Sequence, residues 1–499
     1  MIKYDVIVLG AGLSGLETAY ILSKEGLRVA VLDKNALIGG MIQSFSRKGL
    51  LFNTGFNYVA SMAKGDLLYR YFSYLDVMDS VHFKQLDKNC FEEVQLGNQC
   101  YSLAQGEERF VENLSKSFPE ERENLKKYIR EMKIINNRFP LYNLDEYFSL
   151  VGQSDYYNQE SVGSFLNRMT SNKTLQNVLA GNVILYAGQK EILPAYVLSL
   201  VNYSFIRSAW RIEGGGSHLA SSLADGIKRN GGDILNRKEV VKLEVDSDNK
   251  VSQILCKDGT YYQADKVITS IHPQQTLSYI SDSKLKPIYR NRINKLENSV
   301  GMFTLYVALK KQKMPFQNRN FYTFKSNDVW CVNYSNWPEN YFLYMTEDPK
   351  NKGFAESITV MTYMKYDEVK QWENTTVGRR GEDYKKFKQQ RAEALFHFVA
   401  EKFPDLEESI DSYYSSTPLT YRDYTGSVHG SAYGIIKDCR YPLKTMILPK
   451  SRLKNLYFTG QNLNIHGILG TTISSFVVCS AILGERYLMN KVINSPIHK

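Results

Sequence analysis

The sequence predicts an α/β fold in which a Rossmann-like dinucleotide-binding domain carries an inserted α+β substrate domain. Three observations predict it: a glycine-rich loop after an apolar strand at the N-terminus, a second glycine-rich entry with a hairpin in mid-chain, and a strand followed by an apolar helix near the C-terminus. At 499 residues the chain is too long for one ordinary domain. Its 43% apolar and 23% charged residues are typical of a globular protein.

The N-terminal strand covers residues 6–9 and is aliphatic throughout, as expected of a strand buried on both faces. Residues 10–15 follow with the sequence Gly-Ala-Gly-Leu-Ser-Gly. The next residues predict a helix that ends at Gly26, and residues 29–32 predict a second strand, closed by Asp33. Strand, loop, helix, strand and acid therefore occur in the order that a dinucleotide site requires.

Each of these residues has a physical task in such a site. Gly10 permits the tight turn, Gly12 lets a pyrophosphate approach the backbone, and Gly15 lets the helix and strand pack closely. The helix N-terminus offers free N–H groups to phosphates. The Asp33 carboxylate can accept hydrogen bonds from ribose hydroxyls.

The doublet Gly39-Gly40, followed by Met41, comes six residues after Asp33, and a fold for NAD alone does not need it. Here the sequence resembles the FAD-binding oxidoreductases of the amine oxidase and phytoene desaturase superfamily, whose fold is of the glutathione-reductase type. The resemblance implies FAD as the cofactor, with the doublet near its phosphates and ribityl chain. Residues 51–59 are similar to a family segment near the flavin, with Asn53 in place of the usual Asp.

The middle of the chain gives a second match. Residues 214–216 are three glycines before a helical stretch, and the alternating residues 240–245 and 251–256 predict a hairpin. This arrangement resembles the second FAD-binding segment of the superfamily. By that resemblance, Val240 or Val241 contacts the adenine end of the cofactor.

The C-terminus gives the third match. Residues 455–460 predict a strand, and an apolar stretch over 465–483 predicts a buried helix with its entry loop rather than a membrane span. The N-terminus of that helix can stabilise negative charge on a reduced flavin. Gln461 stands where relatives commonly carry an acid, so this contact is expected to be neutral. The cofactor-binding residues expected from all three matches are Gly10, Ala11, Gly12, Ser14, Gly15, Asp33, Lys34, Gly39, Gly40, Met41, Val240, Val241, Gly460, Gln461, Gly467, Leu469 and Thr471.

Two shorter segments resemble the retinol saturase and carotenoid isomerase branch. Residues 54–58 are similar to its T-G-x-H-Y motif, with Asn57 in place of His, and residues 417–434 to the segment before its last flavin motif. The resemblance implies an oxidoreductase that saturates, desaturates or isomerises carbon–carbon bonds of an isoprenoid, carotenoid or retinoid by hydride transfer with flavin N5. Substrate, direction and electron donor stay open. NAD(P)H is one donor to consider, although the chain has no second nucleotide loop and no separate NADPH domain is expected.

The substrate domain is expected to form from two insertions, the first mostly helical and the second containing a strand over residues 301–309. The FAD-binding domain is then discontinuous. Its expected parts are residues 1–65, 205–290 and 410–499, and those of the substrate domain are 66–204 and 291–409.

No cluster with metal-ligand spacing occurs among the seven histidines and six cysteines, so no metal is expected. His466 lies in the loop beside the expected flavin face and is the one candidate catalytic proton donor. The alternative is that its ring hydrogen-bonds the backbone and shapes the loop.

The net charge of +10 comes without a nucleic-acid motif, so a lipophilic small molecule is the expected partner and nucleic acid is not. Sparse cysteines without C-x-x-C indicate reduced thiols and a cytoplasmic protein. The basic and apolar residues 310–316 suggest peripheral membrane contact, although a solvated loop is the preferred interpretation. The oligomeric state stays open.

Two other function classes remain open. One is an amine oxidase of the same superfamily, which would oxidise a C–N bond and release peroxide. Such enzymes often hold a lysine near N5 and an aromatic cage, and neither can be placed in this sequence. The other is a non-catalytic flavin-binding or lipid-carrier protein, for which the departures at Asn53 and Asn57 leave room.

Overall fold

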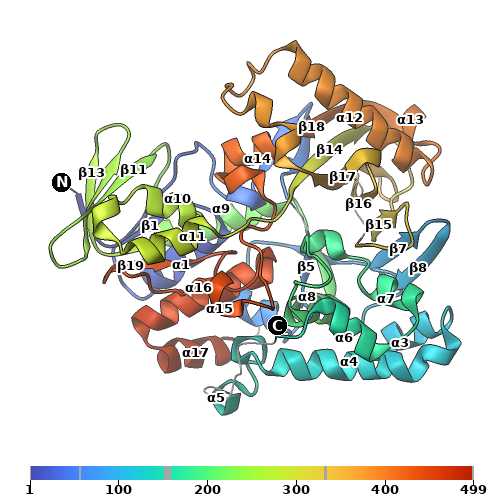
Figure 1. Ribbon diagram of the computed structural model, residues 1–499, viewed down its shortest axis with the longest axis horizontal. Helices are drawn as coiled ribbons and strands as arrows, with labels where there is room; N and C mark the ends of the chain where they lie inside the picture. Colours follow the sequence, from blue (N-terminus) through green and yellow to red (C-terminus); the bar gives the residue numbers. More distant parts are fainter. Residues whose placement is uncertain (1, 56–57, 151–158, 331–333, 497–499) are drawn as a thin grey trace.

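Two seven-stranded sheets organise the protein, and Figure 1 shows them toward opposite sides of the molecule. The computed structural model describes residues 2–55, 58–150, 159–330 and 334–496. Phe56 and Asn57, from the segment similar to T-G-x-H-Y, lie outside the described residues, as does Cys331.

The first sheet is the dinucleotide-binding sheet that the sequence predicts. Its strand order is β10-β2-β1-β13-β12-β11, and β19 pairs with the end of β13. Pairing is parallel among β10, β2, β1, β13 and β19, and antiparallel in the hairpin strands β11 and β12. The strands are β1 (Ile2–Leu9), β2 (Val29–Leu32), β10 (Asp233–Leu235), β11 (Val240–Val245), β12 (Val251–Cys256), β13 (Tyr261–Thr269) and β19 (Leu456–Phe458).

Helix α1 (Leu13–Lys24) follows β1 and packs against α9 (Gly216–Arg229) and α16 (Gly467–Leu483). A Cβ at Gly15 would overlap the Gly10 carbonyl oxygen, so this glycine permits the close approach of helix and loop, as predicted. The predicted buried helix near the C-terminus is α16. No helix in the described ranges is long and apolar enough to cross a membrane.

Glu17 is fully buried between α1 and α16, where the Thr472 and Ser475 hydroxyls donate to its carboxyl oxygens at 2.7 and 2.9 Å. Burial raises its pKa from 4.5 to about 8. Because the folded pKa exceeds the unfolded one, this group favours folding below about pH 4.5 and its contribution is lost as the pH rises toward 8.

Glu17→Gln should therefore remove part of the pH dependence of stability. We expect the free energy of unfolding of the variant, relative to that of the wild type, to increase as pH rises from 5 to 8. The increase is at most about 1.4 kcal/mol per pH unit. Urea denaturation at several pH values measures it, with exposed Glu123→Gln as the control. Identical pH profiles for wild type and Glu17→Gln would contradict the assignment.

The second sheet has the order β18-β14-β17-β16-β15-β7-β8, antiparallel except for the parallel pair of β15 and β7. Strand β14 forms over the predicted residues 301–309 and is mostly apolar, because both of its faces are buried. Phe303, Leu305 and Val307 pack toward α12, while Met302 faces the helices of the first insertion. The strands are β7 (Glu92–Leu96), β8 (Gln99–Leu103), β14 (Gly301–Leu309), β15 (Asn320–Phe324), β16 (Asn340–Glu347), β17 (Ala355–Met364) and β18 (Ile410–Ser416).

One expected domain boundary is revised. Residues from 410 onward are expected in the FAD-binding domain, but β18 pairs antiparallel with β14, with Thr304 opposite Ser416. The second sheet therefore extends past residue 409, because β18 completes the backbone hydrogen bonds of β14. The remaining division into domains stays a prediction.

Smaller elements join the two sheets. Strands β5 (Tyr58–Ala60), β9 (Ala209–Ile212) and β6 (Phe83–Gln85) form a three-stranded sheet, and β3 (Ser44–Arg47) pairs with β4 (Leu50–Asn53). The first insertion is mostly helical, as predicted. The other helices are α2 (Leu67–Tyr74), α3 (Glu107–Ser115), α4 (Arg122–Asn137), α5 (Tyr147–Leu150), α6 (Val162–Met169), α7 (Lys173–Leu179), α8 (Ala195–Arg207), α10 (Pro273–Ser278), α11 (Pro287–Asn294), α12 (Glu382–Ala400), α13 (Leu406–Ser409), α14 (Pro418–Thr425), α15 (Pro442–Thr445) and α17 (Glu485–Ile493).

Candidate functional site

A cavity of about 320 Å³ is lined by loops of the first sheet together with strands of the second. It brings together most of the residues predicted to bind the cofactor, although they come from three distant parts of the chain. Those that line it are Gly10, Gly12, Ser14, Asp33, Lys34, Gly39, Gly40, Met41, Val240, Gly460, Gln461, Gly467, Leu469 and Thr471, together with His466.

Three predicted residues do not line this cavity. Ala11 is buried, and its backbone N–H donates to Asp33 Oδ2 at 2.7 Å. Gly15 faces the Gly10 carbonyl instead. Val241 is 40% exposed while Val240 is buried, because successive side chains of a strand point to opposite faces. Of the two valines that the sequence left as alternatives, Val240 is the one at the cavity.

Two helix N-termini face the cavity. Helix α1 begins after Gly12 and α16 after His466, and neither N-terminus has a side-chain cap. Their first N–H groups therefore keep hydrogen-bonding capacity, and the helix dipoles place partial positive charge at the cavity wall. This arrangement can bind phosphates at α1 and stabilise an anionic ring system at α16.

Asp33 stands at the far end of the loop. Its Oδ2 accepts from the Ala11 N–H and its Oδ1 from the Asn35 N–H at 2.8 Å. Burial raises its pKa, and these two backbone hydrogen bonds oppose the shift. Each carboxylate oxygen retains an accepting lone pair, which suits a ribose hydroxyl.

Beyond Met41 the cavity continues into a largely apolar chamber. Its walls come from β5, α8, β14, β17 and the loop before α16. Such apolar walls suit an apolar ligand. The aliphatic, aromatic and sulfur-containing residues are Ile42, Val59, Leu185, Leu200, Val201, Phe205, Met302, Met361 and Ile465.

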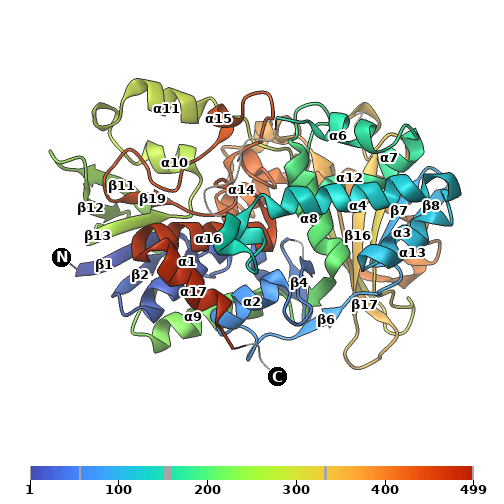
Figure 2. The ribbon, with the colours of Figure 1, turned by 90° about the horizontal axis from the view of Figure 1, so that it is seen from below.

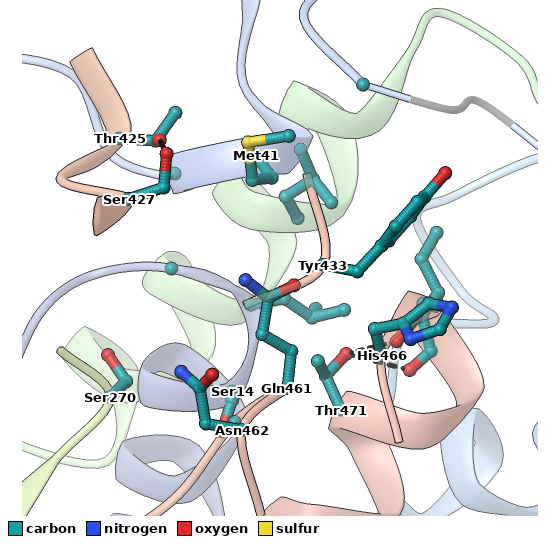
Figure 3. Close-up of a pocket in the computed structure, with 18 of the residues that line it drawn as sticks. Ser14, Met41, Ser270, Thr425, Ser427, Tyr433, Gln461, Asn462, His466 and Thr471 are labelled. Carbon is teal, nitrogen blue, oxygen red and sulfur yellow. Dashed lines mark hydrogen bonds between the residues drawn. The ribbon is translucent and has the colours of Figure 1, made fainter. Parts of the chain in front are cut away.

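His466 lines the chamber next to Tyr433, with ring centroids 4.3 Å apart (Figure 3). Its Nε2 hydrogen-bonds the Leu185 carbonyl at 2.8 Å, and burial lowers its pKa to about 4. At neutral pH the ring is therefore uncharged, and with its Nε2–H directed at a carbonyl it shapes the loop. This geometry favours the structural alternative for His466 over the role of proton donor.

A buried acid behind the chamber wall was missed from the sequence. Tyr58 lines the cavity, stacks on Phe205 at 4.2 Å and donates its hydroxyl to Glu92 Oε1 at 2.6 Å. The Tyr322 hydroxyl lies 2.9 Å from the Tyr58 hydroxyl. Glu92 is fully buried, and burial raises its pKa to about 7. The sequence offers only the acidic pair Glu92-Glu93 at the start of a short strand, without the strand's partner.

A dinucleotide-binding sheet whose cavity opens into an apolar chamber under a second sheet defines a two-part flavoprotein oxidoreductase. Residues 13–476 match the model of the family described as flavin containing amine oxidoreductase. The chain therefore belongs to this family, which confirms the superfamily resemblance, the FAD-dependent oxidoreductase class and the fold. The residues also fit FAD, since a Cβ at Gly12 would meet no atom within 4 Å and the loop leaves open space beside an uncapped helix.

Two relatives span nearly the whole chain. An "All-trans-retinol 13,14-reductase" of Homo sapiens is 25% identical, covering 96% of this chain and 86% of its own length. A "4,4'-diaponeurosporene oxygenase" of Staphylococcus aureus is 24% identical, covering 93% and 94%.

Solved structures share the fold. A putrescine oxidase bound to putrescine has a TM-score of 0.64 at 16% identity, covering 97% of this chain and 99% of its own. An oxidoreductase from Methanosarcina mazei has a TM-score of 0.63, also at 16% identity, covering 96% and 100%.

Proposed function

We propose that this protein is an FAD-dependent oxidoreductase that acts on carbon–carbon bonds of a lipophilic isoprenoid-like substrate. The observation that carries the proposal is the continuity of the cavity, which joins the dinucleotide loop at Gly12 to the apolar chamber at Met302 and Phe205. The names of the relatives, a retinol reductase and a carotenoid oxygenase, support the same substrate class.

The position of each lining residue indicates which part of FAD it would hold. Gly12 and the α1 N-terminus would hold the diphosphate, Asp33 the ribose and Val240 the adenine end, while Gln461 and the α16 N-terminus would hold the ribityl chain and ring. Bound FAD supplies hydride transfer. The apolar chamber positions the polyene and excludes water.

Addition or removal of hydrogen at a double bond also needs a proton. Tyr58 stands at the chamber wall with Glu92 behind it. When Glu92 is protonated, its O–H can donate to the Tyr58 oxygen. The Tyr58 O–H is then free to protonate a substrate carbon, and Glu92 replaces the proton that Tyr58 gives up. Tyr322 holds the Tyr58 oxygen from the other side. For the cycle to repeat, the Glu92 carboxylate must take up a proton from water after each reduction.

The electron donor is proposed to be NAD(P)H or another soluble reductant that reaches the bound flavin. A lipid substrate would reach the chamber through peripheral contact of the protein with a membrane.

The test is anaerobic mixing of the FAD-loaded protein with polyenes. A saturase substrate reoxidises chemically reduced FAD and gains two hydrogen atoms. A desaturase substrate bleaches oxidised FAD and loses two hydrogen atoms. If no isoprenoid alters the flavin spectrum or is itself altered, including by isomerisation, the proposal fails.

An amine oxidase is the second function to test, because the fold is shared with putrescine oxidase. The lysines on the cavity wall, Lys34 and Lys238, stand at the adenine end rather than in the chamber. Peroxide released on addition of an amine would favour this function over the first.

A further inference from the structure

Two short segments, residues 284–295 and 440–454, are rich in basic residues. Each holds five basic residues and no acid, and these ten equal the excess of 62 Lys and Arg over 52 Asp and Glu. The rest of the chain is balanced. The ten are Lys284, Lys286, Arg290, Arg292, Lys295, Arg440, Lys444, Lys450, Arg452 and Lys454.

The two segments lie side by side. Arg292 of α11 donates from Nη1 to the carbonyls of Lys444 and Met446, at 2.9 and 3.0 Å. The Arg452 guanidinium lies 5.9 Å from the ring centroid of Tyr289. Figure 2 shows α11 and α15 next to each other at one rim of the molecule. These contacts bring the two basic segments together.

The same surface carries large apolar side chains that face solvent. Ile288 is 80% exposed, Leu443 64%, Tyr441 58% and Leu448 54%. Ile288 lies one helical turn before Arg292, on the side of α11 that meets α15. We call these four residues with the ten basic ones the α11–α15 patch. Neighbouring exposed apolar side chains of this size mark an interaction site.

Most of the positive charge is free to attract a partner. Arg290 pairs with Asp282 and Arg440 with Asp438, both just outside the two segments. The other eight basic residues form no ion pair within the described part of the chain.

We propose that the α11–α15 patch docks on an anionic lipid bilayer. Basic side chains attract acidic headgroups, and exposed aliphatic and aromatic side chains insert into the interface between them. A nucleic acid would match the charge, but it gives no environment for Ile288 and Leu443. The chain runs directly from Tyr433 in the chamber wall to Arg440 in the patch, so docking would bring the chamber close to the lipid.

The basic residues 310–316, which the sequence suggested for membrane contact, have a different structure. Met314 is buried and Phe316 is half-buried, so the stretch presents its lysines without a large apolar side chain that is mostly exposed. These lysines therefore make a matched control for the patch.

The experiment is co-sedimentation of the purified protein with vesicles of phosphatidylcholine, with and without phosphatidylglycerol. The test variant combines Lys444→Gln, Lys450→Gln and Arg452→Gln, and the control combines Lys310→Gln, Lys311→Gln and Lys313→Gln. Both remove three exposed charges. We expect anionic vesicles to bind the wild type and the control alike, and the test variant roughly 100-fold more weakly. Ile288→Ser with Leu443→Ser should weaken binding by roughly tenfold or more.

Two outcomes overturn the proposal. Equal binding of test and control variants to anionic vesicles would place the contact elsewhere. The second outcome is that the wild type binds neither kind of vesicle but binds a single-stranded oligonucleotide or a polyglutamate peptide, and that the test variant loses this binding. The patch would then be a surface for that partner instead. Circular dichroism of each variant shows that the substitutions leave the fold intact.

Discussion

Replacing Gly12 with valine is expected to abolish FAD retention while leaving the apoprotein folded. The backbone at Gly12 has φ −72° and ψ 174°, which any residue can adopt, and a Cβ there meets no atom within 4 Å. The added methyl groups would instead occupy the space in which the diphosphate approaches α1. We expect the Kd for FAD to rise at least about 100-fold, or about 2.7 kcal/mol.

The control for this prediction is Gly15→Ala. Its Cβ overlaps the Gly10 carbonyl, so this variant should lose about 1–3 kcal/mol of stability even without cofactor. Thermal denaturation of both apoproteins and titration with FAD separate the two effects. Wild-type FAD affinity in Gly12→Val would show that the cofactor does not cross this loop.

Replacing Tyr58 with phenylalanine is expected to lower turnover of the lipid substrate by about 10²–10⁴-fold, the range for loss of general acid–base catalysis. The variant keeps the ring that stacks on Phe205 but loses the hydroxyl bound to Glu92. Tyr322→Phe is the matched control, because its hydroxyl touches the same oxygen and its side chain does not line the cavity. Equal losses in both variants would indicate a structural role for the cluster.

The pH profile gives an independent measure of the same pair. Glu92 has a pKa of about 7 and must hold its proton to serve a reduction, so turnover should fall as pH rises past 7. In a desaturation the carboxylate must accept the proton, so turnover should instead rise as pH rises past 7. The neighbours of Glu92 are Tyr58, Tyr322, Asn182, Tyr128 and Tyr186, and burial raises the pKa values of these tyrosines out of this range.

Glu92→Gln should therefore abolish this limb of the profile. Single-turnover flavin oxidation or reduction between pH 5.5 and 8.5 measures it, and FAD affinity of the variant checks that the cofactor site is intact. An unchanged limb near pH 7 in Glu92→Gln would assign the titration to another group.

The cofactor wall could be predicted because its parts are local. The turn at Gly10 and Gly12, Asp33 after β2 and the start of α16 are each set by a few neighbouring residues. Even the choice between Val240 and Val241 needed only the direction of one strand, which the sequence does not give.

The proton-carrying pair could not be found in this way. Tyr58 and Glu92 are 34 positions apart, and Tyr322 is 264 positions from Tyr58. The parallel pairing of β15 with β7 places Tyr322 and Glu92 together, and no local pattern predicts it. The place of residues 410–416 beside β14 could not be predicted for the same reason, since a strand shows its alternation but not its partner.

The pairing of β1 with β13 has a consequence during synthesis. Val6 lies opposite Val29 of β2 on one side and Lys266 of β13 on the other, so the aliphatic strand leaves the ribosome long before its second neighbour exists. At the usual elongation rates the wait lasts roughly 10–50 s. The β7 edge waits likewise for β15. A nascent chain with two unpaired strand edges exposed for this time is a substrate for chaperones, and C-terminal truncations should aggregate rather than form smaller folded units.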